Sequence, residues 1–388
     1  MLRHFSFSAL STGLLAAFVG FSSSFAIVLA GLTAVGATEA QAASGLMFAS
    51  IAMGVCSVWF AMATRTPAAV AWSTPGAAFL AASPALAGGF SEAVGALVIC
   101  AVAIVLTGLV PALARAVAAI PKPIASALLA GVIFKLCLFP ALALGEIPLL
   151  VLPVFLAWGV GLFLHRLAAV PMAVAAFVGV LVFGVPTPDG TAAELAAALV
   201  PQPQWVVPAF DWSSALSVAL PLYLVTMAGQ NIPGFTVLEL HGYGADRPRL
   251  LRNTGAMSLV TAPFGAIPVN MSAITAAMMS GEDAHRDPAR RYWSTIVCGS
   301  AYILLGVLAG FVTTAVSFAP TLLVTSVAGL ALFPALIASL KAAFEDTSGL
   351  EAPAATFVLT ASSMTLLGIS GAFWGLLIGG ALWWGLRR

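Results

Sequence analysis

The chain has 388 residues, of which 61% are hydrophobic and 7% charged, and its formal net charge is +1. Soluble domains carry about 25% charged residues, so this composition excludes a soluble protein and indicates an all-α polytopic membrane protein. The apolar runs are long and continuous, whereas a β-barrel would show short alternating segments. The near-zero charge offers no basic patch, and no nucleic-acid partner is expected.

Hydropathy and Pro/Gly punctuation predict seven membrane segments in the first half of the chain. They cover residues 8–36, 41–63, 68–86, 90–111, 123–140, 147–166 and 169–186, with an interfacial amphipathic linker at 112–122. The first 43 residues resemble a signal peptide ending near Ala40-Gln41-Ala42. Their apolar run is too long for a signal sequence, so we expect an uncleaved first transmembrane helix.

The third segment is predicted to be broken, because its middle reads as a loop that turns into a helix start. Ser73 or Thr74 can cap a first helical turn, and Pro75 suits the first helical position. Gly76 leaves the backbone open to close approach. A helix that begins inside the membrane presents amide donors and a positive dipole end, most simply to an anionic ligand.

The longest polar stretch, residues 187–211, separates two halves of the chain. Seven more segments follow at residues 213–239, 250–264, 266–281, 291–318, 320–341, 352–368 and 370–386. The tenth is again interrupted, around residues 262–272. Two broken segments at matching positions of two halves are typical of a transporter's substrate site.

The placement of charge predicts the topology. With a cytoplasmic N-terminus, one side of the membrane holds Arg3, Arg65, Arg115, Lys122, Arg166, Arg247, Arg249, Arg252, Arg286, Arg290, Arg291, Lys341, Arg387 and Arg388, and only Lys135 falls elsewhere. The opposite loops hold Glu39, Glu92, Glu146, Asp189, Glu194 and Asp211. This is a positive-inside pattern with both termini cytoplasmic. Because each half has seven segments, an odd number, the halves must be inverted repeats.

Several polar residues lie inside predicted segments. Gln230 and Asn231 precede Pro233 and Gly234, where we expect a helix break; they either bond across helices or face a substrate cavity, and the break favours the cavity. Asn270 is expected to cap the second half-helix, to bind ligand, or both. Ser22, Ser23 and Ser24 suit either a cavity wall or close helix packing. Trp72, Phe79 and Phe264 flank the broken segments as a candidate aromatic wall.

No ionisable group is expected at the membrane midplane, so a proton relay of acidic or histidine side chains is not predicted. Lys135 is expected to extend to the interface. Cys56, Cys100, Cys137 and Cys298 lack CxxC spacing and are expected to be buried thiols. Because the chain has no zinc-binding HExxH motif, P-loop or nucleophile–base pair, we predict no enzyme activity, metal or cofactor.

Five stretches together resemble the benzoate permease (BenE) family of aromatic-acid transporters. They are AWSTPGAA (71–78), TMAGQNIPG (226–234), APFG (262–265), NMSAITAA (270–277) and AHRDPARRYW (284–293). More distantly, the layout is similar to the uracil/xanthine permease and sulfate-transporter fold. That resemblance implies seven-plus-seven inverted repeats, a core and a gate domain, and proton-coupled import of benzoate or a similar aromatic carboxylate.

The resemblance also implies roles for single positions. Gln230 falls where nucleobase permeases carry a substrate-binding Glu, and Ala266 falls near their second Glu. An amide is suited to an anionic substrate, because two carboxylates would repel each other. In one departure, Ala266-Ile267-Pro268 is apolar where many family members place a polar residue such as His.

We therefore predict a multi-pass transporter of a bacterial-type inner membrane. Residues 1–111 and 213–318 would form the core domain, and residues 112–212 and 319–388 the gate domain. The predicted substrate-binding residues are Ser24, Ser73, Thr74, Pro75, Gly76, Gln230, Asn231, Phe264, Gly265 and Asn270. The protein is expected to lie in the lipid bilayer and to use H⁺ as its coupling ion. A homodimer is possible. The alternatives are a nucleobase or other organic-anion carrier of the same fold, an anion channel and a membrane-embedded enzyme.

Overall fold

The computed structural model describes residues 6–186, 188, 190–346, 349–362 and 364–386. Within these ranges, six helices are long and apolar enough to span a membrane: Phe7–Ala34, Glu39–Thr64, Gly89–Leu109, Lys122–Glu146, Trp212–Leu240 and Thr321–Ala343. A seventh span results if Pro288–Val307 and Ala309–Ser317, bent by 55°, are taken together. The predicted polytopic helical architecture is confirmed, whereas fourteen complete spans are not, because the other segments are shorter helices.

The chain forms twenty α-helices and four short strands in its described part. The first half contains α1 (Phe7–Ser22), α2 (Phe25–Ala34), α3 (Glu39–Thr64), β1 (Val70–Trp72), α4 (Thr74–Ala82), α5 (Gly89–Leu109), α6 (Pro111–Ala118), α7 (Lys122–Glu146), α8 (Pro148–Leu164) and α9 (Ala169–Gly184). After the connecting helix α10 (Thr191–Ala197), the second half begins with α11 (Trp212–Ser214), α12 (Leu220–Thr226), α13 (Ile232–Leu240), α14 (Arg247–Thr261), β2 (Val269–Met271), α15 (Ala273–Ser280), α16 (Tyr292–Val307) and α17 (Ala309–Ser317). The chain ends with α18 (Thr321–Ala343), α19 (Glu351–Ala361), the hairpin β3 (Thr365–Leu366) and β4 (Ile369–Ser370), and α20 (Gly371–Leu386).

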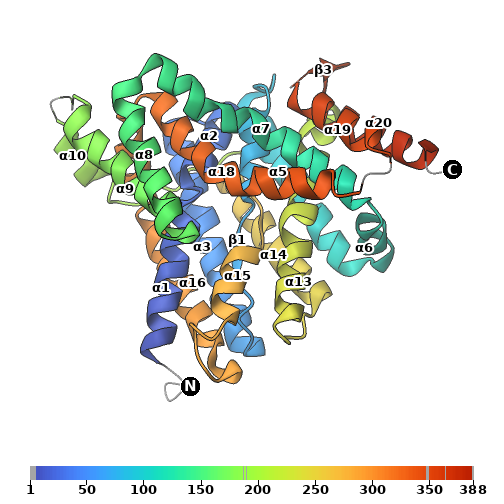
Figure 1. Cartoon of the computed structure of the whole chain (residues 1–388), viewed down its shortest axis with the longest axis horizontal. Helices are drawn as coiled ribbons and strands as arrows, with labels where there is room; N and C mark the ends of the chain where they lie inside the picture. The colour runs from blue at the N-terminus through green and yellow to red at the C-terminus, as the bar shows by residue number, and fades with distance from the viewer. Residues whose placement is uncertain (1–5, 187, 189, 347–348, 363, 387–388) are drawn as a thin grey trace.

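The packing contacts gather most helices into two groups. In Figure 1, α1, α3 and α13–α16 of the first group lie low in the view, α8, α9 and α18–α20 of the second lie high, and α2 and α5 overlap with the second group. We call α1–α5 with α11–α17 the core group, in which α3 packs on α16, α5 on α14 and α2 on α4. We call α7–α9 with α18–α20 the gate group, in which α7 packs on α18 and α19. Small residues allow these close approaches. A Cβ added at Gly54 would lie 2.5 Å from the Gly299 carbonyl oxygen, between α3 and α16.

At the centre of the core group, β1 and β2 pair antiparallel, with Ala71 opposite Asn270. The Ser73 N–H donates to Pro268 O at 2.8 Å, and the Ser272 N–H donates to Ala69 O at 3.0 Å. Each strand leads directly into a short helix, α4 or α15. The two half-helices therefore start at opposite ends of the strand pair and run in opposite directions.

On the outer edge of each strand, one serine hydroxyl pairs with the backbone N–H and C=O groups that a further strand would otherwise bind. Ser57 on α3 accepts the Val70 N–H at 2.9 Å and donates to Val70 O at 3.2 Å. Ser258 on α14 accepts the Val269 N–H at 2.9 Å and donates to Val269 O at 3.5 Å. The two halves thus make the same contacts with opposite chain direction, as the predicted inverted repeat requires.

The expected helix break at Pro233 and Gly234 is wrong. Residues Trp212–Leu240 form one continuous helical span. It contains π-helical turns at Ala215–Ala219 and Met227–Asn231, and α13 begins at Ile232 with Pro233 in its first turn. A proline's missing N–H costs little there, because the widened π turn precedes it and alters the hydrogen-bond ladder.

Other boundaries also differ from the predicted ones. The first segment is interrupted at Ser23 and Ser24, between α1 and α2. The fifth continues through Pro140 to Glu146. The thirteenth ends at Ala361, and the β3–β4 hairpin follows.

The connection between the halves lies across the core group beyond α10. The backbone N–H groups of Gln204, Val206 and Ala209 donate to Ser44 Oγ, Pro263 O and Ser91 O at 3.0, 2.8 and 2.9 Å. This connection is therefore held to α3, to α5 and to the turn Ala262–Phe264 that follows α14. Of the residues used for the topology prediction, Arg3, Asp189, Arg387 and Arg388 lie outside the described residues.

Candidate functional site

Of the two candidate caps at the start of α4, Ser73 and Thr74, the structure uses Ser73. Its Oγ accepts the Gly76 N–H at 3.1 Å, and its carbonyl accepts the Ala77 N–H at 2.7 Å. Pro75 has no N–H. In the described part of the chain, the Thr74 N–H has no hydrogen-bond partner, and the Thr74 side chain is half-buried. The α4 start therefore presents one free backbone donor.

The start of α15 presents two free donors. Ser272 caps it, accepting the Thr275 N–H on Oγ at 3.4 Å and the Ala276 N–H on its carbonyl at 3.2 Å. Within the described ranges, the N–H groups of Ala273 and Ile274 have no partner. The Ile274 side chain is 64% exposed. This half-helix start is thus both electropositive and open.

Asn270 does not cap α15, because it lies in β2, two residues before the Ser272 cap. Its side chain is fully buried. With the amide oxygen turned toward Ser73, Asn270 accepts the Ser73 N–H and donates to Met271 O, both at 3.0 Å. Asn270 therefore ties β2 to the first turn of α4.

Ser24 and Asn231 hold the two strands at equivalent positions of the two halves. Ser24 Oγ accepts the Trp72 indole N–H at 2.8 Å. Asn231 Oδ1 accepts the Met271 N–H at 3.1 Å, and its amide nitrogen lies 3.3 Å from Met227 Sδ. Both residues are buried, 3% and 0% exposed. The structure thus commits their polar atoms to the strand pair.

Gln230 is the polar residue of this π turn that has no structural partner. Its side chain is half-buried and makes no hydrogen bond within the described part of the chain. The neighbouring Gly229 lies against α4 and α7, because a Cβ there would be 3.3 Å from both Pro75 Cγ and Leu129 Cδ2. Thr226 on the same span bonds Ser73, oxygen to oxygen, at 2.7 Å. The turn that carries Gln230 is therefore held at the α4 start.

Phe264 and Gly265 make their contacts elsewhere. The Phe264 ring stacks on Phe48 at 4.0 Å and meets Trp205 edge-on at 5.1 Å, measured between ring centroids. Gly265 has a φ of 82°, and a Cβ there would lie 3.0 Å from Phe90. These recorded contacts join the connection 201–210 to the core group and include neither half-helix start.

The positive potential at the crossing comes from backbone groups, because the buried charged side chains lie elsewhere. Among the described charged side chains, only Glu92 and Arg291 are buried, 7% and 8% exposed. Glu92 Oε2 accepts the Gly88 N–H at 2.7 Å at the start of α5. Arg291 donates to Ser280 O at 2.6 Å and to His285 O at 2.8 Å, at the far end of α15. Free N–H groups and helix dipoles therefore supply the positive potential at the crossing.

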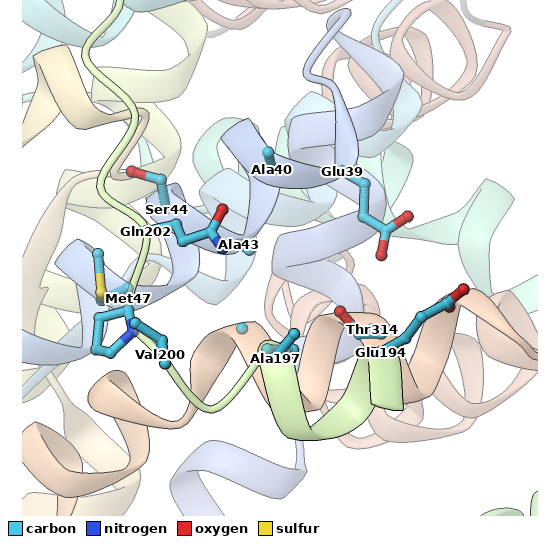
Figure 2. Close-up of a pocket in the computed structure, with 13 residues that line it drawn as sticks. Glu39, Ala40, Ala43, Ser44, Met47, Glu194, Ala197, Val200, Gln202 and Thr314 are labelled. Carbon is cyan, nitrogen blue, oxygen red and sulfur yellow. The ribbon is translucent and has the colours of Figure 1, made fainter. Parts of the chain in front are cut away.

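A cavity of about 400 Å³ lies apart from the crossing, between α3, α10 and α17. Figure 2 shows Glu39 of α3 and Glu194 of α10 at its wall, with Ser44 and Gln202 toward the other end. Two carboxylates make this cavity unfavourable for an anion. No group of three or more His, Cys, Asp or Glu suited to a metal occurs in the described part of the chain.

Comparisons with known proteins agree with this arrangement. A family model described as "Benzoate membrane transport protein" (BenE) matches residues 3–384. Inner membrane protein YdcO of Escherichia coli (strain K12) is 35% identical over 374 residues, 96% of this chain and 94% of that protein. The benzoate membrane transport protein of Acinetobacter baylyi (strain ATCC 33305 / BD413 / ADP1) is 31% identical over 379 residues, 97% of this chain and 94% of that one.

Solved structures show the same fold at low sequence identity. The transmembrane domain of a cyanobacterial bicarbonate transporter, BicA, is 14% identical, with a TM-score of 0.61 over 98% of both chains. The anion transporter SLC26A9 is 13% identical, with a TM-score of 0.63 over 100% of this chain and 66% of that one. These likenesses are to membrane transport proteins, and at this identity they show the fold alone.

Proposed function

The chain belongs to the benzoate membrane transport protein (BenE) family, a family of membrane transporters and not of enzymes, and we propose that it imports benzoate or a similar small aromatic carboxylate. The observation that carries this proposal is the pair of half-helix starts at the β1–β2 crossing. In the described part of the chain, three backbone N–H groups at these starts have no hydrogen-bond partner, while the buried charged side chains bond elsewhere. A single negative charge supplied by the ligand would complete the site.

In this proposal the carboxylate binds near the N–H groups of Thr74, Ala273 and Ile274. Each dipole end would contribute up to about 2 kcal/mol in a partly buried geometry. Gln230 would add an amide hydrogen bond, and the aromatic body would lie against apolar groups such as Leu129 and Pro75. Ser24, Asn231 and Asn270, predicted as ligand contacts, would instead fix the strands that position the half-helices.

The two half-helices differ in how they are covered. The α4 helix packs on α7 of the gate group, whereas the main packing partners of α15 are α1, α13 and α16 of the core group. We propose that movement of the core, residues 1–111 and 213–318, against the gate, residues 112–212 and 319–388, exposes the site to each side in turn. The positive-inside pattern would place the open α15 side in the cytoplasm and the protein in the inner membrane.

Counterflow in proteoliposomes tests the substrate. Labelled benzoate should exchange against unlabelled benzoate, and a panel of aromatic acids should compete while neutral nucleobases do not. Saturable accumulation against a gradient would distinguish a carrier from an anion channel. Stimulation by an inward proton gradient is expected for H⁺ coupling. If benzoate neither exchanges nor competes, the substrate proposal is wrong.

A further inference from the structure

A cavity of about 600 Å³ lies on the α4 side of the crossing. Its walls come from both helix groups. Residues 83–88 and Glu92 line it from the core group, together with Ser213 and Ser217 at the start of the long span. The β3–β4 hairpin lines it from the gate group.

Toward the start of α4, the lining of this cavity overlaps that of a smaller one, and we call the two together the α4-side route. A second cavity of about 20 Å³ shares Ser83, Pro84 and Ser370 with the first and extends to Phe79. Phe79 lies five residues beyond Thr74, which is about 7.5 Å along the helix. The small cavity is lined by side chains from α4, α7 and the segment before β3, including Phe79, Val132 and Met364.

Two hydrogen bonds fasten the hairpin across this route. Ser213 Oγ donates to Gly368 O at 3.0 Å, and Ser370 Oγ donates to Ser217 O at 2.7 Å. Both join the gate group to the core group. The hairpin is itself a tight unit, with Leu367 and Gly368 at positive φ of 56° and 75° in its turn. In the described part of the chain, these two neutral bonds are the hydrogen bonds between the hairpin and the core group, and separation would break them together with the packing of β4 on the π turn Ala215–Ala219.

We propose that the β3–β4 hairpin is the gate over the α4-side route, with the Ser213 and Ser370 hydroxyls as its latch. The route leads to the site described under the proposed function, and so the inference rests on that function. The role of the two hydrogen bonds in holding the hairpin does not depend on which substrate is transported. Separation of the core and gate groups on this side must break both bonds, and the latch therefore stabilises the state in which α15 is open and α4 is covered.

Thiol accessibility tests the latch without any substrate. Thr360 lines the narrow cavity, is 6% exposed, and its hydroxyl has no hydrogen-bond partner in the described part of the chain. The full chain carrying Thr360→Cys would be placed in lipid nanodiscs and treated with a water-soluble maleimide. The parent protein, whose four cysteines are buried, gives the background labelling. Adding Ser213→Ala and Ser370→Ala should raise the labelling rate by about 5-fold for each bond removed.

The control is Ser362→Ala. The Ser362 hydroxyl donates to Leu359 O at 2.7 Å and accepts the Met364 N–H at 3.3 Å, and in the described part of the chain it makes no bond to the core group. This variant should leave the labelling rate unchanged. An unchanged rate in the double variant, or an equal rise in the control, would overturn the latch. Unfolding temperatures close to that of the reporter protein would show that a rise reports opening. Failure of benzoate counterflow in the parent would overturn the substrate proposal and leave this result standing.

Discussion

At the β1–β2 crossing, single serine hydroxyls replace the neighbouring strands of a wider sheet. A backbone group buried in a membrane protein must be paired, and a two-stranded sheet leaves both outer edges unpaired. Ser57 and Ser258 each satisfy an N–H and a C=O of one strand residue. The two half-helices of the proposed substrate site depend on this arrangement, because each follows its strand directly.

Ser57→Ala and Ser258→Ala should each destabilise the protein. Each leaves buried backbone groups of Val70 or Val269 without a partner, at a cost of about 1–3 kcal/mol. The unfolding temperature in detergent should fall by several degrees. The matched control is Ser50→Ala on the same α3 helix, whose buried hydroxyl bonds Leu46 O within its own helix. Equal unfolding temperatures for Ser57→Ala and Ser50→Ala would contradict the role.

Adjacent residues of the π turn should respond differently to substitution. Gln230→Ala removes a side chain with no structural partner, so uptake should fall by about 10-fold with little change in unfolding temperature. Asn231→Ala leaves the buried Met271 N–H unpaired, and it should lower the unfolding temperature as well as uptake. Transport assays and thermal unfolding of both variants check this. A stability loss in Gln230→Ala would contradict its assignment as a ligand contact.

The sequence predicts some of these residue roles and misses others for a physical reason. The Ser73 cap follows from local pattern, because its partner Gly76 is three residues away. The hydrogen-bond partners of Ser24 and Asn231 lie 48 and 40 residues away in the sequence. Local sequence does not reveal such partners, so from the sequence these polar side chains could equally contact a ligand. Buried Trp72 needs a partner for its indole N–H, but its sequence does not say which hydroxyl supplies it.

At the scale of elements, the half-helix α15 is held at both ends. Its start is capped by Ser272, and its last turn is bound by the buried guanidinium of Arg291, which donates to Ser280 O. A cation at a helix C-terminus also stabilises the dipole whose positive end faces the site. The charge pattern alone marks Arg291 as one of many basic loop residues. Its function as a helix anchor depends on the fold of the loop 281–291.

Replacement of Arg291 should therefore be more damaging than replacement of its neighbour. Arg291→Leu leaves the Ser280 and His285 carbonyls without their charged donor, and we expect a loss of several degrees in unfolding temperature and reduced uptake. Arg290→Leu removes only an exposed ion pair to Asp287, worth about 0–1 kcal/mol. Thermal unfolding of both purified variants gives the comparison. Similar losses in the two would show that loop charge, not anchoring of α15, is what matters.

The same scale shows where element prediction failed. Pro233 and Gly234 predict a break by local rules, but the span stays continuous, because the π turn Met227–Asn231 accommodates the proline. The strands β1 and β2 are three residues long and are stabilised by pairing between halves of the chain, which local propensity does not report. The inverted plan itself was predictable, because it follows from charge placement and an odd segment count.

At the scale of the whole molecule, the starts of α4 and α15 differ in how exposed they are, and this difference predicts which of them a water-soluble reagent can reach. Ser73 and Ser272 are the N-caps of α4 and α15. Pro75 and Ile274 therefore occupy equivalent second positions of the two half-helices. Pro75 is buried, whereas Ile274 is 64% exposed. The proposed substrate site therefore has one covered and one open approach, which is what the proposed alternating access requires of a single state.

Cysteines at these two positions should react at different rates with a water-soluble maleimide. Ile274→Cys should be modified rapidly and Pro75→Cys slowly, because only the α15 start is open. Saturating benzoate should slow the reaction of Ile274→Cys, since the proposed carboxylate contacts the N–H of that residue. Rapid reaction at both positions would contradict the asymmetry. Slow reaction at both would place Ile274 against lipid instead of in an aqueous opening, and the α15 start would then no longer serve as the open approach to the site.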